Sequence, residues 1–171
     1  MKLKNFILLF VLLHPIILFA QNEKKIELNC AYGYYESICI GAKYIYKPEI
    51  KFGLLIGNNF RLLNNEKYYT VTLECNTAIF KQKKGTKKNY KWFLTSKIIY
   101  WDMEDKYYRF NVLSFSPAIT RNISINKNLY LSIDIGPLIN IVLESHRKTF
   151  KEVGWPYHVM PNLKFQIAYK I

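Results

Sequence analysis

The sequence predicts an all-β protein: a single antiparallel up-and-down barrel of about eight strands, preceded by a cleaved signal peptide. Apolar and polar residues alternate along much of the chain, as they do in strands, where successive side chains point to opposite faces. Several alternating segments run past ten residues, whereas an ordinary strand has about five or six. After the first 20 residues there is no apolar run long enough for a spanning helix. If the mature chain crosses a membrane, it must do so as a closed barrel.

The segment Met1–Ala20 has the features of a secretory signal peptide. Lys2 and Lys4 precede an apolar stretch, and a polar sequence follows Ala20. A membrane anchor is the alternative, but the stretch is short for a helix that needs about 20 residues. Pro15 would also break such a helix. We therefore expect a signal peptide at 1–20 and an outer-membrane β-barrel domain at 21–171.

The expected strands follow one another along the mature chain, separated by polar or turn-rich pieces such as Lys47-Pro48-Glu49. The alternation is clearest in the last two segments, while the third, fifth and sixth are β-branched and aromatic but less regular. The segments are Ile26–Tyr34, Ile38–Lys47, Ile50–Phe60, Val71–Ile79, Tyr90–Trp101, Tyr107–Ile119, Leu129–Leu143 and Asn162–Ile171.

Strand length favours a membrane barrel over a soluble sandwich, because a tilted spanning strand needs about 9 to 11 residues. Aromatic residues near the expected strand ends are typical of the girdles at the two membrane interfaces, although strands favour tyrosine in any case. These residues are Tyr46, Tyr68, Tyr69, Tyr100, Trp101, Tyr107, Tyr108, Trp155, Tyr157 and Tyr169.

From Ile26 to Ile171 the chain resembles the small outer-membrane β-barrel (porin-like) family of Gram-negative bacteria. The resemblance rests on the signal peptide, the even strand count, the segment Asn128–Pro137 and the final segment Asn162–Ile171. It implies export through the inner membrane, location in the outer membrane, and assembly by the barrel-assembly machinery. It also implies contact with outer-membrane lipid and with lipopolysaccharide.

In such a barrel both termini face the periplasm and four connections face outward. The longest is expected at Glu144–Tyr157, and the candidate ligand-binding residues in it are Arg147, Lys148, Lys151 and Trp155. The interior of an eight-stranded barrel is just filled by side chains, so we expect no open pore. The charged residues expected to point inward are Glu27, Lys43, Glu74, Lys97, Arg109, Asp134, Lys164 and Lys170.

No motif for a reaction is evident, so we expect a non-enzymatic protein with no catalytic residues, no metal site and no cofactor. Glu144-Ser145-His146 contains the residue types of a hydrolase triad, but neighbours in an extended chain point apart, whereas a triad must converge. The formal net charge of +13 would suggest nucleic acid in a cytosolic protein, but export excludes that partner. The basic run Lys81–Lys88 falls on the periplasmic side by strand parity.

Two other functions remain open at this stage. One is a soluble exported barrel that binds an apolar small molecule, as lipocalins do, because alternation does not reveal whether the apolar face points outward to lipid or inward to a ligand. The other is a lipid-modifying barrel enzyme. Coordinates in which Ile133, Ile139 and Phe165 line a central pocket would exclude the membrane barrel.

Overall fold

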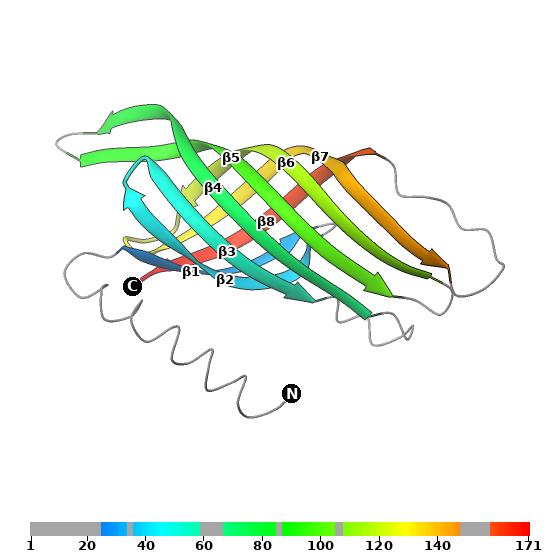
Figure 1. Ribbon diagram of the computed structural model, residues 1–171. Helices are drawn as coiled ribbons and strands as arrows, with labels where there is room; N and C mark the ends of the chain where they lie inside the picture. The colour runs from blue at the N-terminus through cyan, green and yellow to red at the C-terminus, as the bar shows by residue number, and fades with distance from the viewer. Residues whose placement is uncertain (1–24, 34–35, 59–66, 85–86, 105–107, 148–157) are drawn as a thin grey trace, which may run out of the picture.

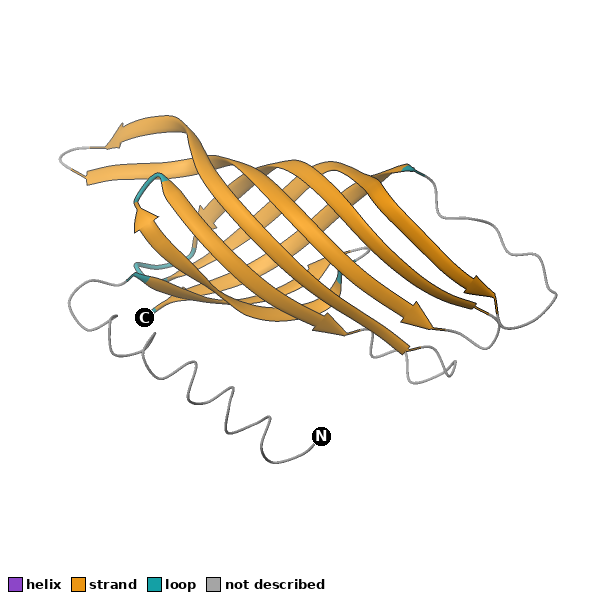
Figure 2. Ribbon diagram, in the orientation of Figure 1, coloured by secondary structure: helices purple, strands orange, loops and turns teal. Residues whose placement is uncertain are grey.

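The computed structural model describes residues 25–33, 36–58, 67–84, 87–104, 108–147 and 158–171. These residues form one closed barrel of eight antiparallel strands (Figure 1). Apart from the strands, the described residues lie in short turns (Figure 2). The strands are β1 (Ile26–Gly33), β2 (Ser37–Lys47), β3 (Ile50–Asn58), β4 (Lys67–Lys84), β5 (Lys87–Glu104), β6 (Tyr108–Ser124), β7 (Leu129–Arg147) and β8 (Val159–Lys170).

Each strand pairs with the next one in sequence, and β1 closes the barrel by pairing with β8. The predicted all-β, eight-stranded, up-and-down architecture is therefore confirmed. The start of β1 and the end of β8 lie at one end of the barrel, which we call the terminal end. The β2–β3, β4–β5 and β6–β7 connections lie at this end, and the other four connections lie at the opposite end. None of the described residues forms a helix that is long and apolar enough to cross a membrane.

The predicted alternation of faces is confirmed in β1 and β8, where every second side chain is buried inside the barrel. In β1 it places Cys30 on the outer surface, while Cys39 of β2 is buried in the interior. In β2 the apolar residue Ile45 falls where the alternation calls for a polar one. The pairing of β2 with β3 shifts register between Ile45 and Lys47. An extra residue in one strand is the usual cause of such a break.

β7 is longer than the sequence suggested, because it continues through Glu144 to Arg147 instead of ending at Leu143. Within it, Ile141 and Val142 are both exposed, and the pairing with β6 shifts register at Leu113. A bulge thus interrupts the alternation without ending the strand. The expected outer connection at Glu144–Tyr157 is correspondingly shorter.

The β6–β7 ladder also has a gap, between the pairs Phe115–Ile139 and Ile119–Ile135. Pro117 lies in the stretch of β6 that this gap leaves unpaired with β7, and proline has no N–H to donate to a ladder. Gly136 allows the two backbones to approach there, since a Cβ at this position would lie 2.0 Å from the Pro117 carbonyl oxygen.

Candidate functional site: an apolar outer wall around a charged interior

The outer surface of the barrel is apolar across several adjacent strands. Leu73 of β4 pairs with Leu54 of β3 and Ile98 of β5, and all three side chains are about half exposed. Phe165 is 49% exposed, so it points away from the interior. A soluble protein keeps most of its charged side chains outside, whereas this barrel buries several of them and exposes rows of apolar side chains on its outer surface.

Four of the aromatic residues expected at strand ends are exposed on the outer surface: Tyr46, Tyr69, Tyr100 and Tyr169. The expectation is wrong for Tyr68 and Trp101, which are buried inside the barrel. Tyr107, Trp155 and Tyr157 lie outside the described residues, and Tyr108 begins β6. The outer surface also carries aromatics outside that expectation: Tyr32, Tyr44, Phe52, Phe80 and Trp92.

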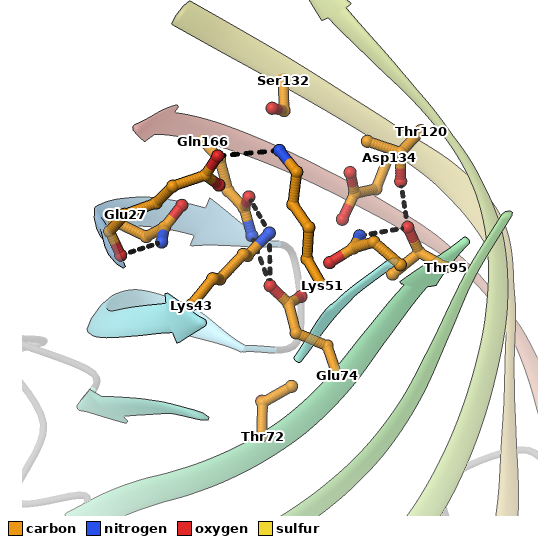
Figure 3. A network of polar contacts seen from close by, with 12 residues as sticks. Glu27, Lys43, Lys51, Thr72, Glu74, Thr95, Thr120, Ser132, Asp134 and Gln166 are labelled. Carbon is orange, nitrogen blue, oxygen red and sulfur yellow. Dashed lines mark hydrogen bonds and ion pairs between the residues drawn. The ribbon is translucent and has the colours of Figure 1, made fainter. Parts of the chain in front are cut away.

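The middle of the interior is a network of ion pairs centred on Glu74 of β4. Its carboxylate faces Lys43 of β2 and the ammonium of Lys164 of β8, which lies 3.5 Å away. Gln166 accepts a 2.8 Å hydrogen bond from Lys43 through its carbonyl oxygen and donates to Glu74 through its amide. Glu74, Lys43 and Gln166 come from different strands and point toward one another in the lumen (Figure 3).

The connection between β1 and β2 supplies a second carboxylate to this network. Glu36 is fully buried, and its carboxylate lies 3.1 Å from the Lys164 ammonium. Thr72 donates a 3.4 Å hydrogen bond to the same carboxylate, and the Glu36 carbonyl oxygen accepts one from Thr70. Ser37, the next residue, has a φ of 57°, the left-handed backbone region that is uncommon outside turns. The turn thus directs Glu36 into the lumen.

Toward the terminal end, Glu27 of β1 binds the ammonium of Lys51 at 2.8 Å. The hydroxyl of Tyr130 donates to the same carboxylate, and the Lys51 ammonium lies 5.0 Å from the centre of the Tyr130 ring. Lys170 reaches Glu27 from the edge of the barrel, at 3.8 Å. A further buried pair joins Lys97 and Asp134 at 2.8 Å. Ion pairs and hydrogen bonds across the lumen therefore also join β1 to β3 and β7, and β5 to β7.

The opposite end of the lumen is filled by apolar side chains instead of charges. These are Tyr68, Ile99, Trp101, Phe110, Val112, Leu138 and Met160. Trp101 donates its indole N–H to Ser114 at 2.9 Å, which satisfies the one polar group of that side chain. We call these seven residues the apolar plug. Along the barrel axis, the ion network fills the lumen toward the terminal end, and the apolar plug fills it toward the opposite end.

A cavity of about 10 Å³ remains among the interior side chains, next to Lys43, Lys51, Asn76 and Tyr130. That is room for about one water molecule. The prediction of a lumen filled by side chains agrees with this packing.

Of the charged residues expected to face inward, six are buried in the interior: Glu27, Lys43, Glu74, Lys97, Asp134 and Lys164. Lys170 lies at the edge and contributes to the network. The expectation is wrong for Arg109, which is exposed and pairs with Asp102 through two hydrogen bonds of 3.1 and 2.8 Å. Phe110, its neighbour, takes the inward position.

Sequence reasoning missed two members of the network. Lys51 lies in an irregular segment in which Gly53, Leu54 and Leu55 obscure the alternation. In the structure Leu55 and Lys51 share the inward face, but the sequence alone gives no reason to start the period from Leu55 instead of Leu54. Glu36 lies in a connection between strands, where no period assigns a face.

Of the four predicted ligand-binding residues, the structure describes the position of Arg147. Arg147 is the last residue of β7 and pairs with Tyr108. Lys148, Lys151 and Trp155 fall outside the described residues. The sequence Glu144-Ser145-His146 forms part of β7.

No protein-family model matches the chain. No curated protein matches it either. Among solved structures, the chain is similar to a major outer membrane protein from Thermus thermophilus, with 11% sequence identity and a TM-score of 0.46. The similarity covers 85% of this chain and 98% of that one.

Proposed function

We propose that this chain is a non-enzymatic β-barrel of the bacterial outer membrane with a structural or surface-interaction role. Its strands cross the bilayer, the chain termini face the periplasm, and the opposite end faces outward. The observation that carries the proposal is the inverted surface, which is apolar around the outside and charged within. A bilayer accepts charged side chains at membrane depth only where they face away from lipid.

The alternative of a soluble barrel with an apolar ligand is disfavoured by the same geometry. Such a barrel needs an apolar cavity in its lumen, and its outer surface meets water. Here the lumen holds the buried ion pairs of Glu74 and Glu27, and the cavity beside Lys43 has room for about one water. A soluble protein would also expose a far larger continuous apolar surface than monomers usually tolerate.

Fractionation of cells that produce the full chain tests this proposal. We expect the protein in the outer-membrane fraction, without Met1–Ala20, and with a folded band that shifts on heating before electrophoresis. Recovery of the folded protein from the detergent-free soluble periplasm would contradict the proposal. Planar bilayer recordings of the purified barrel provide an independent check, because the filled lumen should give no steady conductance.

The surface-interaction role depends on the outward connections, and in particular on Arg147, Lys148, Lys151 and Trp155. We propose that these residues contact lipopolysaccharide phosphates or another external anionic ligand, since arginine and lysine bind such groups. Changing the three cations to glutamine should weaken binding of purified lipopolysaccharide to the detergent-solubilised barrel by about a hundredfold, because each cation near an anionic surface contributes about 1 kcal/mol. Equal binding by the wild type and the variant would remove these residues from the proposal.

A further inference from the structure

The charges of the barrel interior balance. Among the side chains whose burial the structure describes, four lysines and four carboxylates are buried there: Lys43, Lys51, Lys97 and Lys164 with Glu27, Glu36, Glu74 and Asp134. The large positive charge of the chain must therefore belong to residues outside the interior. The next question is how this positive charge is divided between the two ends of the barrel.

The positive charge gathers at the terminal end. Lys47 at the end of β2, Lys91 near the start of β5, Arg121 near the end of β6, and Lys127 in the β6–β7 turn are all exposed; we call these four residues the basic rim. By strand position, five further lysines lie at the same end: Lys81, Lys83, Lys84, Lys87 and Lys88. The acidic residue that the structure describes on the surface of this end is Glu49.

The opposite end has a different balance. Among its described side chains, Asp102, Glu104 and Glu144 carry negative charge, and Arg109, which binds Asp102, carries positive charge. By strand position, Lys67 and Arg147 lie at the same end. Over the part of the chain that the structure describes, the terminal end is therefore strongly basic, whereas the opposite end carries charges of both signs in similar number.

Two cations of the basic rim, Arg121 and Lys47, lie directly beside the apolar wall. The guanidinium of Arg121 lies 5.2 Å from the centre of the Trp92 ring, and the Lys47 ammonium lies 5.3 Å from the centre of the Tyr46 ring. Trp92 and Tyr46 are exposed on the outer surface. Aromatic rings of this kind settle at the level of the lipid head groups, and long basic side chains keep their stems on apolar surface while the charge reaches the polar layer.

We propose that the basic rim binds anionic phospholipid head groups in the leaflet at the terminal end of the barrel, which is the periplasmic leaflet. This rests on the proposed function, because it requires the outer wall to be embedded in a bilayer. Head-group phosphates are favoured over a soluble polyanion because the cations adjoin the lipid-facing wall, where the phosphates of a bilayer lie. Each basic residue close to such a surface strengthens the attraction to anionic lipid.

Spin-labelled lipids test the proposal on the full mature chain, reconstituted in phosphatidylcholine vesicles. The measured quantity is the preference of barrel-associated lipid for labelled phosphatidylglycerol over labelled phosphatidylcholine at low salt. We expect the wild type to prefer phosphatidylglycerol by about fivefold, the effect of roughly one cation. The variant Lys47→Gln, Lys91→Gln, Arg121→Gln and Lys127→Gln should lose that preference.

A matched control compares two charges at each end. The variant Lys67→Gln, Arg109→Gln at the opposite end should keep the wild-type preference, and the variant Lys47→Gln, Arg121→Gln at the basic rim should lower it. An equal loss in these two variants would overturn the proposal. Inorganic phosphate that abolishes the preference more strongly than sodium chloride of equal ionic strength would also overturn it, by indicating a phosphate-ion site. Heat-dependent migration shows that each variant is folded. A chain with no barrel-associated lipid signal would refute the membrane barrel itself, whereas associated lipid without selectivity would refute only the basic rim.

Discussion

Replacing Glu74 with glutamine should lower the free energy of unfolding by about 3–5 kcal/mol, the usual cost of removing one partner from a buried ion pair. Glu74 is fully buried and faces both Lys43 and Lys164. The change keeps the size of the side chain but removes its charge, so the buried ammonium groups of Lys43 and Lys164 both lose a carboxylate partner. Urea titration of the barrel in lipid vesicles, followed by tryptophan fluorescence and heat-dependent migration, measures the loss.

The matched control is the exposed ion pair at the opposite end. Arg109→Gln breaks the hydrogen bonds to Asp102, yet it should leave the unfolding midpoint unchanged because solvent screens exposed pairs. The double variant Lys43→Met, Glu74→Gln should recover part of the loss, since removing both partners costs less than removing one. A Glu74→Gln barrel as stable as the wild type would show that water, rather than Lys43 and Lys164, solvates this carboxylate.

The sequence sufficed for the fold because the face of a strand residue is a local property. A period of two assigns inside and outside from neighbouring residues alone, and it correctly placed Asp134 and Lys164 in the lumen before any contact was known. The same reasoning failed at Arg109, because β6 is rich in apolar residues on both faces and the period there is weak. Phe110 then occupies an inward position that a charge had been expected to fill.

The sequence predicted a filled lumen, but it did not identify all the residues that fill it. Aromatic side chains suit both a membrane interface and a packed interior, so Tyr68 and Trp101 could not be assigned from their position near strand ends. Their place in the apolar plug depends on packing with residues from other strands, among them Phe110 of β6 and Met160 of β8. Glu36 was missed for a similar reason, since the turn before Ser37 is what directs it inward.

The outer wall gives the most direct test of what surrounds the barrel, through Leu73→Lys. This residue lies in the middle of β4, in a row with Leu54 and Ile98. In a bilayer the new ammonium faces hydrocarbon, and the free energy of unfolding measured in vesicles should fall by about 2–4 kcal/mol, the cost of a lysine at the midplane. The penalty arises in the folded state, because the unfolded chain can expose the lysine to water.

Ile123→Lys provides the control, because this exposed residue lies near the terminal end of β6, two positions beyond Arg121. Close to the interface the cost of a lysine falls to about 0–1 kcal/mol. The two substitutions should therefore lower the free energy of unfolding by different amounts, although each replaces an exposed apolar residue with lysine. In a barrel surrounded by water both positions would accept lysine equally well. The new charge would also make the protein more soluble by breaking up an apolar patch. The dependence on depth therefore distinguishes lipid from water around the wall, and two equally stable variants would refute the membrane barrel.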